Sequence, residues 1–145
     1  MKLERDLREF IELLNAHEVR CLVVGAHALA FHGRPRYTAD IDFFVDSSPE
    51  NAQRMSDTLQ EFGLVDIGVS SADFTASDLI VQLDTEPNRV DMMTSISGVT
   101  FNEAWKSRAT GELDGLPVQF ISKELLKRNK AAVGRKQDLA DLDYL

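Results

Sequence analysis

Two aspartates, Asp40 and Asp42, stand two residues apart in the segment Thr38–Val45, Thr-Ala-Asp-Ile-Asp-Phe-Phe-Val. Polar and apolar residues alternate up to Phe43, which predicts a strand, and residues two apart in a strand point to the same face. The two carboxylates then lie roughly 7 Å apart along the chain. Carboxylate oxygens are the ligands that Mg²⁺ prefers, so this pair indicates a site for divalent cations.

A third aspartate, Asp91, lies between apolar residues in a second predicted strand, residues 89–93. If this strand pairs beside the first, Asp91 lies roughly 5 Å from the acidic pair across the ladder. Three carboxylates without a lysine between them would repel one another unless a cation neutralised them. Such ions can bridge triphosphate oxygens and activate an attacking hydroxyl. A strand whose polar face simply meets water also carries Asp-x-Asp, so the pair needs support from elsewhere in the chain.

That support lies upstream, where an apolar run, residues 20–25, leads into a glycine turn and a short helix, residues 26–32. The run Arg-Cys-Leu-Val-Val-Gly is typical of a buried strand. Backbone amides at the start of a helix can receive phosphate oxygens. Gly25 and Ala26 are therefore candidates for phosphate contact. A dinucleotide-binding domain is not indicated, because Gly25 lacks the G-x-G-x-x-G spacing.

Together these residues resemble the polymerase-beta-like nucleotidyltransferase superfamily. Its signature is an apolar strand, Gly followed by Gly or Ser, about ten residues, and then Asp-x-Asp or Asp-x-Glu on a strand; here Gly25-Ala26 precedes Asp40-Ile41-Asp42. The strings at 33–42 and 126–139 are similar to the minimal bacterial branch, which includes AbiEii-type toxins and related toxin-antitoxin components. The resemblance implies transfer of a nucleoside monophosphate from a nucleoside triphosphate to an acceptor hydroxyl.

The resemblance also implies site residues. Catalytic and metal-binding roles, with Mg²⁺ or Mn²⁺, fall on Asp40, Asp42 and Asp91. Nucleotide-binding roles fall on Gly25, Ala26, Arg36, Thr38 and Lys130. Arg36 could equally be solvent-exposed or paired with nearby acids, and a basic face at Lys130 is often solvated or paired with Asp138 and Asp141. The acceptor would be RNA, a protein or a small molecule, and a partner protein from a toxin-antitoxin pair is expected.

One departure from the signature opens a second reading. Ala26 stands where many active members have Ser or Gly, and it offers no hydroxyl to the terminal phosphate. The alternative is a noncatalytic nucleotide-binding or protein-interaction module, antitoxin-like, that keeps the fold. The three acids argue against that alternative.

Composition narrows the partners and the location. The chain has 145 residues, the size of one domain, residues 1–145, and a formal net charge of -8. That charge argues against broad binding to duplex DNA, which depends on clustered basic residues. No apolar run approaches the roughly 20 residues that span a bilayer, and the first residues are too charged for a signal peptide, so we expect a cytoplasmic protein without a membrane segment.

The remaining patterns complete the predicted fold, which is α/β (α+β): a polymerase-beta-like small mixed β-sheet flanked by helices, with the helical cover on one side. Apolar spacing and capping residues predict helices at 3–17, 49–62, 101–108, 123–133 and 136–145. Further strands are predicted at 79–83 and 116–121. Residues 65–77 have no clear period beyond a short strand at 65–69.

Overall fold

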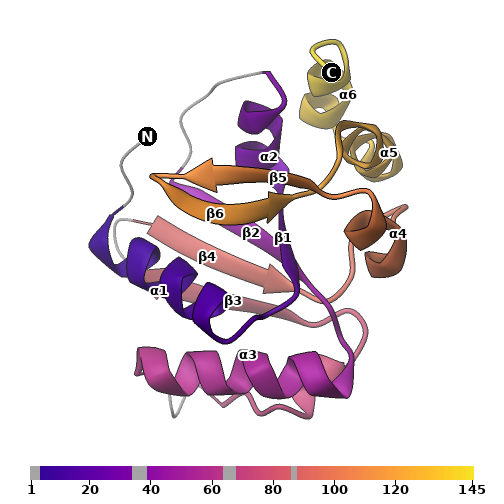
Figure 1. Ribbon diagram of the computed structural model, residues 1–145. Helices are drawn as coiled ribbons and strands as arrows, with labels where there is room; N and C mark the ends of the chain where they lie inside the picture. Colours follow the sequence, from indigo (N-terminus) through magenta and orange to yellow (C-terminus); the bar gives the residue numbers. More distant parts are fainter. Residues whose placement is uncertain (1–3, 34–38, 64–67, 86–87) are drawn as a thin grey trace.

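The computed structural model describes residues 4–33, 39–63, 68–85 and 88–145 (Figure 1). Arg36, Thr38 and most of the short strand expected at 65–69 lie outside the described residues. The helices are α1 (Arg5–Ala16), α2 (Gly25–Phe31), α3 (Pro49–Phe62), the 3-10 turn η1 (Asp73–Thr75), α4 (Phe101–Lys106), α5 (Lys123–Val133) and α6 (Lys136–Leu142). The strands are β1 (Cys21–Val24), β2 (Asp40–Val45), β3 (Ile80–Thr85), β4 (Asn88–Met93), β5 (Ala109–Leu113) and β6 (Leu116–Phe120).

The strands form one mixed sheet in the order β3-β4-β2-β1-β6-β5. β2 pairs with β4 in parallel and with β1 in antiparallel, and β1 pairs with β6 in parallel. A parallel pair needs a crossover connection, and the chain between β2 and β4 contains α3. The predicted mixed sheet is therefore present, with the acidic strands β2 and β4 as neighbours in its middle.

The ends of α3 follow directly from the sequence. The Ser48 hydroxyl accepts a hydrogen bond from the backbone N–H of Asn51 at 3.3 Å, and Pro49 occupies the first helical position. Gly63 ends the helix in the left-handed conformation, with a φ of 98°. Serine as a cap, proline at the first position and glycine at the end are the preferred residues for these places, so the predicted bounds are confirmed.

Helices contact the sheet on both sides. Phe10 on the buried face of α1 packs against Phe43 of β2, with the centroids of the two rings 6.3 Å apart. The next strand residue, Phe44, points the opposite way and its ring lies 5.2 Å from that of Phe101 in α4. The expectation of a cover on one side was therefore too narrow.

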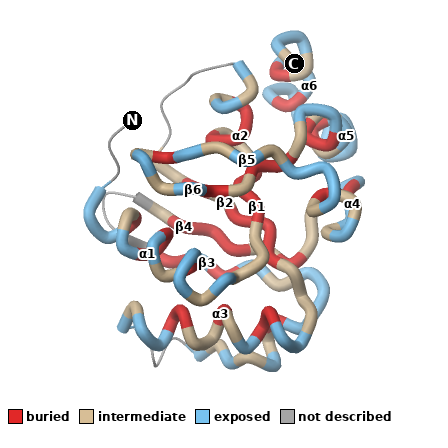
Figure 2. Tube along the Cα trace, in the orientation of Figure 1, coloured by how far each residue is buried: buried red, intermediate tan, exposed pale blue. Residues whose placement is uncertain are grey.

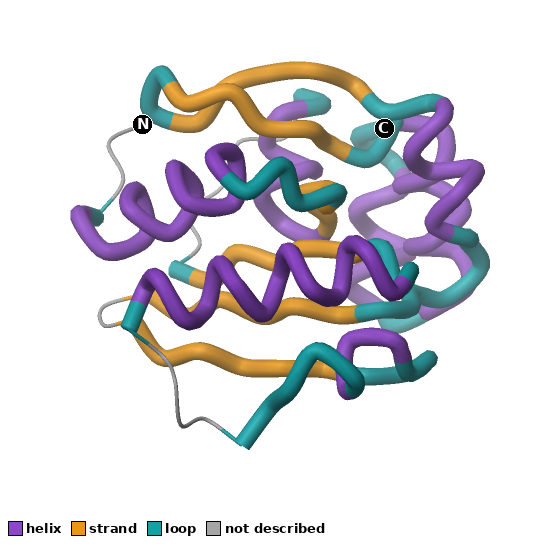
Figure 3. Tube along the Cα trace, turned by 60° about the horizontal axis from the view of Figure 1, so that its bottom comes forward, coloured by secondary structure: helices purple, strands orange, loops and turns teal. Residues whose placement is uncertain are grey.

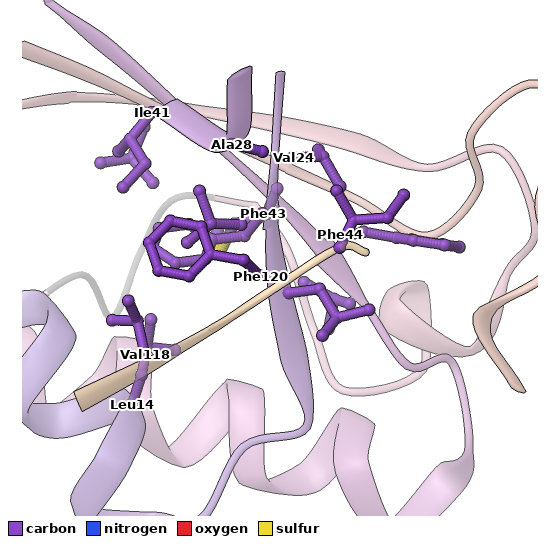
Figure 4. Close-up of a cluster of buried hydrophobic side chains, with 14 of the residues drawn as sticks. Leu14, Val24, Ala28, Ile41, Phe43, Phe44, Val118 and Phe120 are labelled. Carbon is purple, nitrogen blue, oxygen red and sulfur yellow. The ribbon is translucent and has the colours of Figure 1, made fainter. Parts of the chain in front are cut away.

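The core lies mainly between the sheet and the α1–α3 pair. Figure 3 shows these two helices side by side, and the rings of Phe10 and Phe62 meet at 5.3 Å. Buried residues concentrate in the central strands and on the inward side of α3 (Figure 2). Figure 4 shows part of this cluster, in which Phe43 and Phe120 come from different strands. These contacts fix β2, and with it the positions of its two aspartates.

Two elements differ from the sequence expectation. β5 was not predicted; it forms an antiparallel hairpin with β6 through Asp114 and Gly115, which both have positive φ. α6 ends at Leu142 and does not continue to the last residue.

Among the described helices, none combines the length and the apolar content that crossing a membrane requires.

Candidate functional site

The three predicted aspartates meet in the middle of the sheet. In the parallel pairing of β2 with β4, Asp42 lies directly opposite Asp91, and Asp40 lies opposite Arg89. Residues directly opposite one another in a ladder share a face, and so do residues two apart along a strand. The condition that the sequence analysis set, β4 beside β2, is therefore met, and all three acids lie on one face of the sheet.

These acids line a polar pocket of about 340 Å³. Its walls come from the start of α2, from β2 and β4, and from α5 and α6 with Arg135 between them. The lining residues are Gly25, Ala26, Asp40, Asp42, Arg89, Asp91, Lys130, Arg135, Gln137 and Asp138. Figure 1 shows α2, α5 and α6 gathered on one side of the molecule. The pocket thus collects residues from distant parts of the chain, almost all of them charged or polar.

Gly25 is required by the way α2 begins against β2. Its φ is +67°, a value that residues with a side chain rarely adopt. A Cβ at this position would collide with the Oδ2 atom of Asp42. The glycine therefore permits the backbone to approach the carboxylate directly. Its neighbour Ala26 also lines the pocket and places only a methyl group there.

Arg89 supplies a positive charge that the sequence analysis missed. Its Nε lies 3.2 Å from Asp91 Oδ1 and its Nη2 lies 3.3 Å from Asp91 Oδ2, a paired hydrogen bond. The same Nη2 lies 3.4 Å from Asp40 Oδ2. Arg89 precedes Asp91 by two residues on a strand, so the alternation of side chains was a sufficient signal for its position.

Asp42 is the acid whose ionisation the site disfavours. Its pKa is raised from 3.8 to about 6, mainly because burial removes the carboxylate from water. The negative charge of Asp91 and a hydrogen bond with that residue raise the pKa further, and Asp40 adds to the effect. Arg89 opposes the shift without cancelling it. Burial and the two neighbouring carboxyl groups together therefore disfavour a site in which all three acids are ionised.

The donor set suits a divalent cation, but the side chains are arranged around Arg89. Carboxylate oxygens on neighbouring strands are the hard ligands of Mg²⁺ and Mn²⁺, and a cation beside Asp42 would favour the ionised form that burial and the neighbouring acids disfavour. In the part of the chain that the structure describes, however, no three His, Cys, Asp or Glu side chains are placed closely enough to hold an ion as they stand. Asp40, Asp42 and Asp91 are the residues that could hold such an ion after a rearrangement of their side chains.

The opposite wall is a network of charges on α5 and α6. Lys130 is 6% exposed, and its Nζ lies 3.1 Å from Asp141 Oδ2 and 3.4 Å from Asp138 Oδ1. Arg135 donates from Nε to Asp138 Oδ2 at 2.6 Å, and these hydrogen bonds lower the pKa of Asp138. Lys130 thus lines the pocket and is paired with both aspartates, as one of its two interpretations expected, while its nucleotide-binding role stays a prediction.

The structure brings six of the eight predicted site residues together, and the other two, Arg36 and Thr38, lie outside the described residues. Sequence reasoning did not predict Arg89, Arg135, Gln137 or Asp138 as site residues. Arg89 could have been found from strand alternation. Gln137 and Asp138 depend on how α6 folds back beside α5, and no local pattern indicates that packing.

Two solved structures share this fold. One is a protein from Thermotoga maritima assigned to the nucleotidyltransferases, with a TM-score of 0.66 and 21% identity over 96% of this chain and 89% of that one. The other is the lincosamide antibiotic adenylyltransferase LnuA with lincomycin bound, with a TM-score of 0.58 and 15% identity over 98% of this chain and 95% of that one. No curated protein matches the chain. Residues 3–145 match the family described as "Nucleotidyl transferase of unknown function (DUF2204)", and the chain belongs to that family.

Proposed function

We propose that this protein transfers a nucleoside monophosphate from a nucleoside triphosphate to an acceptor hydroxyl with the assistance of a divalent metal ion. The observation that carries the proposal is the register of β2 and β4, which sets Asp42 beside Asp91 and brings Asp40 to the same pocket. Family membership supports the reaction class. The metal is proposed from the carboxylates and from the raised pKa of Asp42.

The proposed reaction assigns a task to each acid. Asp40, Asp42 and Asp91 would hold Mg²⁺ or Mn²⁺, which supplies positive charge against the triphosphate oxygens. Asp91 also accepts the proton of the acceptor hydroxyl. The hydroxyl oxygen forms a bond to the α-phosphorus, the bond from that phosphorus to the bridging oxygen breaks, and the electron pair leaves with pyrophosphate. Gly25 and Ala26 offer backbone amides to the phosphate oxygens, and Lys130 places positive charge on the facing wall.

Partners and location extend the same proposal. The acceptor is a hydroxyl of RNA, a protein or a small molecule, and the resemblance of residues 33–42 and 126–139 to the AbiEii-like branch is the ground for proposing a partner protein from a toxin-antitoxin pair. We place the protein in the cytoplasm. The likeness to the lincosamide adenylyltransferase is a likeness of fold, so it does not select one acceptor class over another.

A noncatalytic module is the second candidate, favoured by Ala26, which presents a methyl group where a hydroxyl would reach the terminal phosphate. In its nucleotide-binding form, such a module would bind a nucleotide without transferring it; in its protein-interaction form, it would bind a partner protein. The nucleotide-binding form would use the same pocket, so binding alone does not separate the two candidates. Transfer to an acceptor does.

The test combines binding with labelling. Each of the four NTPs is titrated calorimetrically into wild type, Asp42→Asn and Asp91→Asn, with Mg²⁺ or with EDTA, and Glu9→Gln on the exposed face of α1 serves as the matched change of charge. We expect metal-dependent binding in wild type and the control, and its loss in both site variants. Labelling of RNA, protein or small-molecule acceptors from α-³²P-labelled NTP then supports transfer. Binding without labelling favours the nucleotide-binding module. No binding to wild type refutes the nucleotide site and leaves the protein-interaction form of the module.

A further inference from the structure

Arg89 contacts the carboxylate oxygens of two of the three acids, and a bound cation would need these same oxygens as ligands. Its two donors take both oxygens of Asp91, at 3.2 and 3.3 Å, and one of them also reaches Asp40 Oδ2 at 3.4 Å. The Asp91 side chain is only 11% exposed, so little water competes for these oxygens. A divalent ion on Asp40 and Asp91 would have to share or take over these contacts.

The surroundings of Arg89 allow it to move. Its side chain is 42% exposed, and it lies at the pocket wall on β4, opposite the position of Asp40 on β2. The guanidinium carries five donors in a planar fork that matches phosphate oxygens as well as carboxylates. A small rotation about the side-chain bonds can therefore exchange a carboxylate partner for a phosphate partner without moving the backbone.

We propose that Arg89 is a built-in counterion, which occupies Asp40 and Asp91 in the nucleotide-free protein and is displaced by the divalent ion onto the triphosphate. This inference rests on the proposed function for its second half, the phosphate partner. Its first half, competition between Arg89 and the ion for the same oxygens, concerns this chain's own residues. In this scheme Arg89 offsets part of the negative charge of the acids when the pocket is empty, and it becomes a phosphate ligand when the metal binds.

A permanent ion pair is the alternative. In that case Arg89 would only stabilise the two strands. Its removal would lower the stability of the protein, and the affinity for the metal would rise no more than it does when any other positive charge is removed from the pocket. Arg135 provides the matched control, because it also lines the pocket and acts on Asp42 through its charge, while its hydrogen bonds go to Asp138. Competition therefore predicts that removing Arg89 raises the metal affinity more than removing Arg135 does, whereas general electrostatics predicts an equal rise.

The experiment measures Mn²⁺ binding to the nucleotide-free chain by electron paramagnetic resonance for wild type, Arg89→Gln and Arg135→Gln. Displacement of a paired charged contact predicts that Arg89→Gln binds Mn²⁺ roughly tenfold more tightly than wild type, and several-fold more tightly than Arg135→Gln. In the presence of Mn²⁺, the affinity of Arg89→Gln for a non-hydrolysable α,β-methylene NTP should fall by roughly tenfold, because a phosphate ligand is lost. Arg89→Lys, which keeps the charge without the fork, should lie between wild type and Arg89→Gln in both measurements.

Equal Mn²⁺ affinity in Arg89→Gln and Arg135→Gln would overturn the inference. If Arg89→Gln does not fold, the same comparison is made with Arg89→Lys, and Mn²⁺ affinity no higher than that of wild type overturns it. Failure of the proposed function gives a different result. If the Arg89 variants bind Mn²⁺ more tightly but wild type binds no NTP, the competition between Arg89 and the ion is supported and the triphosphate substrate is refuted. If wild type transfers the nucleotide but the Arg89 variants have unchanged Mn²⁺ affinity, the proposed function is supported and the counterion role of Arg89 is refuted.

Discussion

Replacing Asp42 by asparagine should stabilise the metal-free protein at neutral and alkaline pH. Burial and the negative charge of Asp91 raise the pKa of Asp42 from 3.8 to about 6. Between these two values the folded protein binds more protons at Asp42 than the unfolded chain does, so the stability that protonated Asp42 contributes is lost as the pH rises through about 6. Asparagine resembles the protonated acid in shape and charge and avoids that loss.

The magnitude follows from the size of the shift. A pKa change of about two units corresponds to roughly 3 kcal/mol, and because Asp42 is only half-buried, solvent screening reduces this to roughly 1–3 kcal/mol. In a chain of 145 residues that difference raises the melting temperature by roughly 3–10 °C. At pH 4, where Asp42 is protonated in the folded protein, wild type and variant should unfold at nearly the same temperature.

The assay is thermal unfolding followed by circular dichroism in EDTA, at intervals from pH 4 to pH 8. Glu9→Gln changes the net charge by the same amount on an exposed part of α1 and should follow wild type across this range. A second series in Mg²⁺ should raise the melting temperature of wild type with increasing concentration and leave Asp42→Asn unchanged. If Asp42→Asn in EDTA at pH 8 melts at or below the wild-type temperature, the reasoning from the raised pKa of Asp42 is refuted.

Three further changes test the framework around the site, each by urea unfolding. Gly25→Ala places a Cβ against Asp42 at a φ of +67° and should cost at least about 2 kcal/mol, together with the metal-dependent binding of NTP. Lys130→Met removes the ammonium group 3.1 Å from Oδ2 of the buried Asp141 and should cost roughly 3–5 kcal/mol; a neutral result would mean that this ion pair does not stabilise α5 and α6. Ser48→Ala removes the cap of α3 and should cost about 1 kcal/mol without any change in nucleotide binding.

The acidic part of the site was open to prediction because strand alternation determines it. Asp40 and Asp42 share a face in any strand, and the only further condition was that the strand of Asp91 be their neighbour. β4 is that neighbour, in the register that sets Asp42 against Asp91. The same rule applied to Arg89 puts its guanidinium among the acids, a basic partner that the search for a lysine between the carboxylates did not consider.

β5 was missed although the chain carries a signal for it. Asp114-Gly115 between two apolar residues is a strong hairpin sequence, and both residues have the positive φ that a two-residue turn demands. The strand itself gives a weak pattern because Gly111 lies in its middle. A Cβ at Gly111 would collide with the rings of Phe31 and Phe120, which stack at 4.0 Å. The packing of α2 against β6 therefore requires glycine at position 111. Local strand propensity does not indicate this requirement.

The charge of the pocket shows why the acidic composition of the chain is compatible with an anionic substrate. The chain carries a formal charge of -8, but the lining of the pocket is close to balance. Its charged side chains are Asp40, Asp42, Asp91 and Asp138, and Arg89, Lys130 and Arg135. Their formal sum is -1, so a single divalent ion turns the described lining positive. The proposed metal would then reverse the sign that a triphosphate meets, which is why the site needs neither a basic surface nor a basic chain.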